Sequence, residues 1–209
     1  MKNKKGKFFV LEGGEGSGKS SQLKKLSEYF GERVLITREP GGSPYAEEIR
    51  SLILNSENAK QADAKTHFAL FWAARADHLK NTILPALARR QNVLVDRFDS
   101  STYAYQVFAQ EASELKDFFW KMRQFYLGKN IPSRYFFLDV EPSIGLARKQ
   151  KQKREVLNHF DERDVQFHTR MRKGFLDFFK QVPYSTIDAN QPFDTVTMTL
   201  VTELKKYII

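Results

Sequence analysis

Cysteine is missing from the whole chain of 209 residues, so disulfide bonds and thiolate metal ligands are excluded. No apolar run is long enough to cross a bilayer, which argues against a membrane-spanning protein. The basic first residues, MKNKKGK, lead into an apolar segment without the apolar core and small-residue cleavage site of a secretory signal. These absences together predict a cytoplasmic protein that has no membrane partner.

Internal repeats, low-complexity tracts and linkers are absent too, and the length suits one well-buried domain. Short apolar runs, typical of strands covered on both faces, lie at residues 8–11, 34–37, 92–96, 135–140 and 184–188. Stretches with helical apolar spacing lie between them, at residues 45–54, 63–89, 101–110, 114–127, 143–153 and 163–180. This alternation predicts a single three-layer α/β domain, 1–209, with a five-stranded parallel sheet flanked by helices.

The first apolar run is followed by a glycine-rich segment with the spacing Gly13-x-x-x-x-Gly18-Lys19-Ser20, and then by a helical pattern. Backbone N–H groups can surround a polyphosphate only where the chain approaches closely, which glycine permits. The strand, loop and helix context argues against a chance glycine-rich turn and predicts a P-loop NTPase fold that binds ATP. The donor phosphates are expected to bind Gly13, Gly14, Glu15, Gly16, Ser17, Gly18, Lys19 and Ser20.

Two further strand ends share the edge of the sheet that carries this loop. One continues into Thr37-Arg38-Glu39-Pro40-Gly41-Gly42 and the other into Asp96-Arg97-Phe98. Ligands of parallel sheets bind at the carboxyl ends of the strands. We therefore expect Asp96, with the Ser20 hydroxyl, to hold Mg²⁺, and Arg97 to bind a second phosphate group. An ordinary strand-end cap is the alternative reading of Asp96.

Several enzyme classes are disfavoured by what the chain lacks. An Asn-Lys-x-Asp segment and an Asp-x-x-Gly segment, which GTPases need, do not occur. The net charge of +9 is compatible with nucleic-acid binding, but the basic run at 148–154 fits a solvated helix face equally well. A small-molecule kinase that joins two phosphorylated ligands fits better. A kinase with a different acceptor and a nucleic-acid-stimulated ATPase stay open as alternatives.

With these motifs in order, the chain resembles the bacterial thymidylate kinases over essentially its whole length. The matching segments are residues 13–20, 37–42, 47–50, 70–75, 96–98, 100–106, 137–140 with Pro142, 167–168, 172–175, and 187–189 with 191–192. The resemblance implies transfer of a phosphoryl group from ATP to dTMP, with magnesium, in dTTP synthesis. It also implies a homodimer and no nucleic-acid partner. The apolar helices between Asp63 and Gln110 are the expected contact, although they would fit an ordinary core equally well.

The resemblance also implies roles for individual residues. Phe71 is expected to stack on thymine and Arg75 to reach its carbonyl edge, although residues 70–72 on their own would be read as helix core. Lys19, Arg97, Glu15 and Arg154 are the expected catalytic residues, and the P-loop Glu15 is expected near the acceptor sugar. The expected substrate-binding residues are Glu15, Arg38, Glu39, Arg50, Phe71, Arg75, Arg97, Thr102, Tyr105 and Gln106.

A helical lid at about 145–161 is the last element that the resemblance implies. The phosphate loop contains no arginine, and family members of this kind take the catalytic arginine from the lid. Arg154 is the expected residue and Arg148 the alternative. The chain departs from the family pattern at His159-Phe160-Asp161, where many members have Arg-Ile-Glu.

Overall fold

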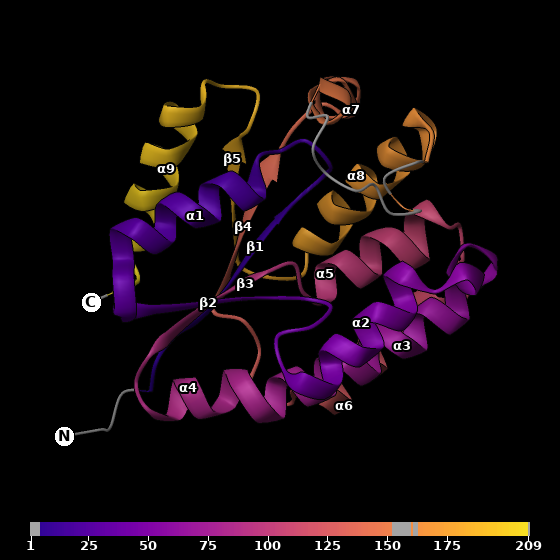
Figure 1. The fold of residues 1–209 in the computed structure, drawn as a ribbon, viewed down its shortest axis with the longest axis horizontal. Coiled ribbons are helices and arrows are strands. Elements are labelled where there is room, and N and C mark those ends of the chain that lie inside the picture. The colour runs from indigo at the N-terminus through magenta and orange to yellow at the C-terminus, as the bar shows by residue number, and fades with distance from the viewer. Residues whose placement is uncertain (1–4, 152–159, 161–162, 209) are drawn as a thin grey trace.

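A five-stranded parallel sheet with the strand order β2-β3-β1-β4-β5 forms the centre of the molecule (Figure 1). The structure is a computed structural model that describes residues 5–151, 160 and 163–208. The strands are β1 (Phe8–Gly13), β2 (Val34–Arg38), β3 (Asn92–Asp96), β4 (Arg134–Asp139) and β5 (Tyr184–Asp188). Every strand overlaps one of the apolar runs, so the predicted five-stranded parallel sheet is confirmed.

Helices cover both faces of this sheet. They are α1 (Lys19–Phe30), α2 (Pro44–Asn55), α3 (Ala64–His78), α4 (Leu84–Ala88), α5 (Asp99–Thr102), α6 (Leu115–Leu127), α7 (Pro142–Lys151), α8 (Val165–Phe179) and α9 (Phe193–Lys205). Wider π-helical turns, Leu79–Ile83 and Tyr103–Ala109, continue α3 into α4 and extend α5. Within the described part of the chain, no helix has both the length and the apolar character needed to cross a membrane.

The side chains of β1 alternate between two apolar cores, as expected for a strand that is buried on both faces. Phe8 and Val10 belong to the core formed with α3, α6 and α8, whereas Phe9 and Leu11 belong to the core formed with α1 and α9. The sheet therefore lies between two helical layers. This arrangement leaves the carboxyl ends of β1, β2 and β3 side by side and free to carry polar groups.

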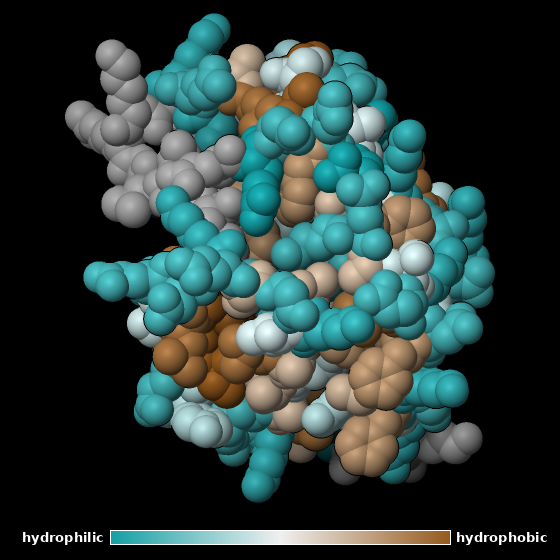
Figure 2. Space-filling model, turned by 90° about the vertical axis from the view of Figure 1, so that its right-hand side faces the viewer, coloured by the Kyte–Doolittle hydropathy of each residue, from teal (hydrophilic) through white to brown (hydrophobic). Residues whose placement is uncertain are grey.

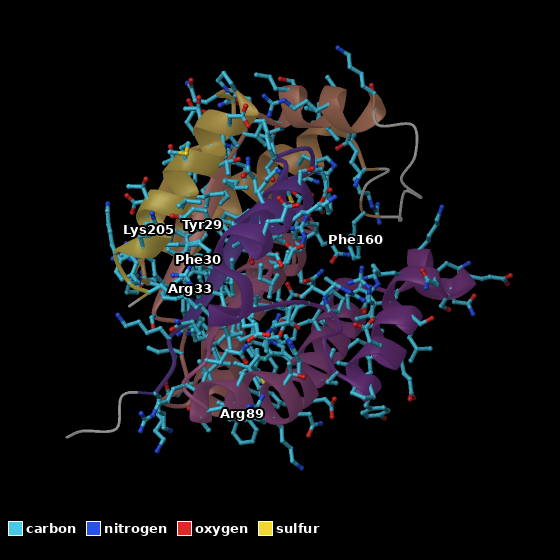
Figure 3. The ribbon with its side chains drawn as sticks, turned by 60° about the vertical axis from the view of Figure 1, so that its left-hand side comes forward. Tyr29, Phe30, Arg33, Arg89, Phe160 and Lys205 are labelled. Carbon is cyan, nitrogen blue, oxygen red and sulfur yellow. The ribbon has the colours of Figure 1, made fainter. Side chains whose placement is uncertain are left out.

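Helix α9 is the one long helix that the apolar spacing did not predict. It is rich in β-branched residues, whose restricted χ1 lowers helix propensity. Tertiary packing outweighs this cost, because Val196, Leu200, Val201 and Leu204 are buried in the core shared with α1. Figure 3 shows the ends of the two helices together, where the Lys205 ammonium lies 4.9 Å from the centre of the Tyr29 ring.

Two substitutions on α9 test this explanation. Leu200→Ala removes a fully buried side chain and leaves a cavity, so we expect the free energy of unfolding to fall by about 2–5 kcal/mol. Met198→Ala truncates a side chain that is 66% exposed on the same helix and should change stability by less than about 0.5 kcal/mol. Urea unfolding of both variants measures the difference, and equal losses would contradict the packing assigned to α9.

Candidate active site

A cavity of about 240 Å³ opens at the carboxyl edge of the sheet, between the phosphate loop, α2, α3 and the segment after β3. All ten residues expected to bind substrate line it: Glu15, Arg38, Glu39, Arg50, Phe71, Arg75, Arg97, Thr102, Tyr105 and Gln106. Lys19, Ser20 and Asp96 line it as well. Residues that lie up to about ninety positions apart in the sequence are thus brought to one site.

The phosphate loop connects the end of β1 to the start of α1. Gly16 has a φ of 66°, and a Cβ atom there would lie 1.9 Å from the carbonyl oxygen of Gly145 in α7. A Cβ atom at Gly145 would in turn lie 2.2 Å from the carbonyl oxygen of Glu15. Both conditions require glycine, and they bring α7 into direct backbone contact with the loop.

Lys19 is folded back over this loop. Its Nζ donates to the carbonyl oxygens of Gly13 and Gly14, at 2.7 and 3.1 Å. Burial, together with the nearby positive charge of Arg97, lowers the pKa of Lys19 to about 8. Keeping the Lys19 ammonium group charged is costly in this place. An anion that binds beside it therefore strongly favours the charged form.

Glu15 is surrounded by groups that neutralise its charge. The Nη2 atom of Arg97 lies 2.6 Å from Glu15 Oε1, and the Tyr105 hydroxyl donates to the same oxygen at 2.9 Å. Lys149 Nζ, from α7, lies 3.5 Å from Glu15 Oε2. A carboxylate inside a phosphate loop is unfavourable by itself, and here it gathers positive charge at the place where phosphates would bind.

Arg97 has a φ of 63°, which is uncommon for a residue other than glycine. Its backbone N–H donates to Leu11, and its Nη1 donates to Gly13 O at 3.2 Å. Burial by itself would lower the pKa of Arg97, but Tyr105 and Glu15 raise it above the ordinary value. The guanidinium group therefore stays charged and is held against the phosphate loop.

Glu12 holds the backbone that follows Arg97, and the sequence motifs did not identify it. Its buried carboxylate accepts from the N–H groups of Phe98 and Ser101 at 2.9 and 3.2 Å, and from the hydroxyls of Ser100 and Ser101 at 2.7 and 2.9 Å. Burial raises the pKa of Glu12. An acid at the end of an otherwise apolar strand was the signal that could have drawn attention to it.

Arg75 is fixed on every side. Its Nε donates to Glu39 Oε2 at 2.9 Å and its Nη2 donates to Thr102 Oγ1 at 3.1 Å. The guanidinium carbon lies 4.6 Å from the Trp72 ring centre and 5.0 Å from that of Phe98. Its Nη1 is buried and has no hydrogen-bond partner among the described residues, so one donor is left for a ligand.

The remaining polar groups of the cavity divide into two sets. Gln106 Nε2 donates to Gln110, while Gln106 Oε1 finds no partner within the described part of the chain. Arg38 is paired with Glu47 at 2.9 Å, and Arg50 donates to Pro40 O at 2.7 Å. Burial and the neighbouring charge of Arg38 lower the pKa of Arg50. Gln106 thus offers an acceptor in the same cavity as the Arg75 donor, and Arg38 and Arg50 offer two cations.

Aromatic rings form the apolar wall of the cavity. Phe71 is partly buried on α3, and Phe160 is buried with its ring 5.7 Å from that of Tyr105. Figure 3 places Phe160 on the side where α7 faces α2 and α3. The sequence does not indicate this position for Phe160, because its contacts with His67 of α3 and with Tyr105 are purely tertiary.

The lid residues give a divided result. Arg154 lies outside the described residues. Arg148 donates to the carbonyl oxygens of Ala189 and Asn190 and does not line the cavity, whereas its neighbour Lys149 does. The helical register of α7 determines which of these neighbouring side chains turns toward the loop, and the basic run alone could not indicate it.

A central parallel strand that runs into a glycine-rich loop and helix, beside a second strand end bearing Asp96 and Arg97, defines the class of P-loop NTPases. The family model "Thymidylate kinase" matches residues 11–199. The chain belongs to the thymidylate kinase family.

Individual relatives agree with this assignment. A thymidylate kinase of Geobacillus sp. (strain WCH70) is 40% identical, with 92% of each chain covered. One of Protochlamydia amoebophila (strain UWE25) is 42% identical, over 90% of this chain and 87% of that one. The crystal structure of thymidylate kinase from Ehrlichia chaffeensis matches with a TM-score of 0.73 and 26% identity, over 96% and 99% of the two chains.

The lowered pKa of Lys19 leads to a pH prediction. Bound phosphates favour the ammonium form and raise its pKa, so binding should take up a proton above about pH 8, and affinity should fall as the pH rises through that value. Calorimetry of a non-hydrolysable ATP analogue, in buffers with different ionisation enthalpies, measures this uptake. Lys19→Arg, which stays charged, should bind without proton uptake. A wild-type affinity that is constant from about pH 7 to 9.5 would contradict the prediction.

Proposed function

We propose that the chain transfers the γ-phosphoryl group of ATP to dTMP, giving dTDP and ADP. Membership of the thymidylate kinase family supports the reaction. The observation that carries the proposal is the single cavity lined both by Lys19 and Ser20 of the phosphate loop and by the Arg75 and Gln106 side chains. One end of that cavity suits a phosphate donor, and the other suits a planar base.

The unpartnered atoms of the cavity are complementary to thymine. The ring edge of thymine presents a carbonyl oxygen next to an N–H group, and the cavity presents the Arg75 Nη1 donor and the Gln106 Oε1 acceptor, neither of which has a partner in the part of the chain that is described. Phe71 would cover the face of the ring. Buried polar groups left without partners favour a ligand that satisfies both of them.

The acceptor phosphate is expected to meet Arg97 and Arg50, with Arg38 at the entrance. Glu15 and Tyr105, which are joined by a hydrogen bond, are placed to meet the sugar between base and phosphate. Arg97 and Arg50 lie in the same cavity as Lys19, so a phosphate oxygen of the acceptor can be brought toward the γ-phosphorus. Holding two reactants in line replaces an encounter in solution by a step within one complex.

Magnesium fits the residues present. Asp96 Oδ1 is buried and, within the described residues, has no hydrogen-bond partner, and the Ser20 hydroxyl lines the same cavity. No group of three or more acidic or histidine side chains in the described ranges could hold a metal ion alone, as expected where phosphates supply much of the coordination. We propose that Ser20 and Asp96 hold Mg²⁺, which would neutralise phosphate charge during transfer.

Transfer then needs no strong general base. An ionised phosphate oxygen of dTMP attacks the γ-phosphorus, the bond to the β-γ bridging oxygen breaks, and ADP leaves with that oxygen. Lys19 and the loop N–H groups would hold the transferring group, Arg97 would hold the acceptor, and a lid cation would stabilise the charge between them. Arg154 remains the residue proposed for the lid, and among the described lid residues Lys149 lines the cavity.

The experiment that tests the function is a coupled ADP-release assay over a panel of nucleoside monophosphates. We expect turnover with dTMP and loss of turnover in Lys19→Ala, whose folding is checked by circular dichroism. Turnover with another acceptor but not with dTMP would show a different kinase. ATP hydrolysis that DNA or RNA stimulates, in place of transfer, would show a nucleic-acid-dependent ATPase.

Phe71 provides a prediction for the base site. Removing its ring in Phe71→Ala should raise the KM for dTMP by about tenfold or more, because stacking on the base is lost, and should leave the KM for ATP within about twofold. Phe71→Tyr keeps the ring and serves as the control with a nearly unchanged KM for dTMP. Steady-state kinetics with each substrate varied gives both values. Equal effects on the two substrates would exclude the stacking role.

A homodimer is the second part of the proposal. Among the described residues, the segment 63–110 contributes no exposed large apolar side chain, so we place the contact on the neighbouring helices α2 and α6. The exposed large apolar residues of these two helices are Tyr45, Leu52, Phe118 and Phe125. Figure 2 shows apolar side chains gathered in the lower half of the face that carries these helices. Such a patch favours association with a second copy.

Phe125 tests this contact, because its side chain is 79% exposed on α6. Phe125→Asp would place a charge in the interface, so we expect a dimer of wild-type chains and a monomeric variant at micromolar concentration. Met198→Asp changes an exposed apolar residue on α9 and should remain dimeric. Sedimentation velocity distinguishes the species, and a monomeric wild type would refute the proposal.

A further inference from the structure

His78 is completely buried at the end of α3, one helical turn after Arg75, and none of the motifs assigned it a role. Its Nδ1 lies 3.1 Å from Glu39 Oε1, and its Nε2 lies 2.9 Å from Thr37 Oγ1 on β2. Both nitrogens of the ring are therefore engaged, one by a carboxylate and one by a hydroxyl.

The partners of the imidazole determine which nitrogen carries the hydrogen. A carboxylate only accepts hydrogen bonds, so the Nδ1 atom that faces Glu39 must donate. The threonine hydroxyl can donate to the remaining Nε2 atom of a neutral ring. The arrangement selects the tautomer with hydrogen on Nδ1.

Glu39 is shared between His78 and Arg75. Its Oε1 faces His78 and its Oε2 accepts from Arg75, and the exposed fractions of the three side chains are 3%, 0% and 1% for Glu39, His78 and Arg75. The carboxylate thus has one oxygen for each partner. If the bond from His78 were lost, the Glu39 carboxylate could turn about its side-chain torsions, which would loosen one of the two hydrogen bonds that orient the Arg75 guanidinium.

The backbone after Glu39 also packs on the imidazole. Gly42 has a φ of 84°, and a Cβ atom at this position would lie 2.4 Å from His78 Nε2. The ring therefore fills the space under the segment that leads from β2 to α2. It fixes the position of this segment and the direction of the carboxylate at the same time.

We propose that His78 is a positioning residue for base selection: its Nδ1–H group holds Glu39 so that Arg75 presents one fixed N–H to the acceptor base. The proposal rests on the proposed function. It deepens that function by adding a residue that touches no substrate and acts through two others.

Base selection follows from the fixed direction of that donor. Thymine presents a carbonyl oxygen at ring position 4, which accepts from Arg75, whereas cytosine presents an amino group there, which cannot accept. A rigid Arg75 N–H group would face the cytosine amino group, donor against donor. Because neither group can rotate away, cytosine is rejected. A guanidinium with more freedom would bind thymine less well and reject cytosine less strongly.

Asparagine and glutamine separate the two contacts of the ring. The amide nitrogen of Asn can take the place of Nδ1, so His78→Asn keeps the bond to Glu39 and loses the one to Thr37. The amide of Gln reaches the place of Nε2, so His78→Gln keeps the contact with Thr37 and loses the bond to Glu39. Both variants replace the ring by an amide, so a purely structural role would affect them similarly.

The measurements are KM and kcat for dTMP and for ATP, the ratio of kcat/KM for dTMP over dCMP, and the Tm of each variant. We expect His78→Gln to raise the KM for dTMP and to lower the dTMP preference by about tenfold each, with the KM for ATP unchanged. His78→Asn should stay within about threefold of wild type in all of these. Equal kinetic effects of the two variants would overturn the proposal.

The tautomer of the wild-type protein gives a second test that needs no variant to fold. Nitrogen-15 spectra of histidine-labelled protein should show hydrogen on Nδ1 of His78, and a form with hydrogen on Nε2 alone would overturn the proposal. If the wild type is active on dTMP and His78→Gln has the same preference for dTMP over dCMP as the wild type, the role of His78 is refuted and the proposed function stands. A folded wild type that is inactive on dTMP refutes the proposed function and this inference together.

Discussion

The buried carboxylate of Glu12 accepts four hydrogen bonds from the residues after Arg97, and it extends from the same strand that leads into the phosphate loop. This connection fixes the distance between the loop and the guanidinium of Arg97. An apolar residue at Glu12 would leave the buried N–H group of Phe98 without a partner, which is costly. The phosphate loop and the segment that carries Arg97 are therefore both held by the end of β1.

Charge at this edge is arranged in sets that compensate one another before any ligand arrives. Lys19 is occupied by loop carbonyl oxygens, and Glu15 lies between Arg97 and Lys149. The cations therefore already lie inside the site, where an anion that displaced one of these internal partners would find them in place. Such an arrangement lowers the reorganisation that accompanies binding.

Local signals in the sequence allowed the fold to be predicted, whereas most of the cavity residues were predicted from the resemblance to the thymidylate kinases. Apolar runs marked the strands, and the glycine spacing marked the loop. Pairings such as Glu39 with Arg75, which join residues 36 positions apart, depend on how α3 lies against β2 and leave no trace in spacing. Helix α9 escaped prediction for the opposite reason, because its β-branched residues disfavour locally what packing favours globally.

The close approach of Gly16 and Gly145 has a consequence for how this protein can change. Neither position can gain a side chain until the two backbones separate, and separation would open the phosphate loop. A substitution at either residue thus disturbs the contact between both segments. No change in a neighbouring side chain can relieve it, because the new Cβ atom would clash with main-chain atoms. Amino-acid changes in α7 are therefore expected on its other faces. The contact between the helix and the phosphate loop should stay the same while the surrounding sequence diverges.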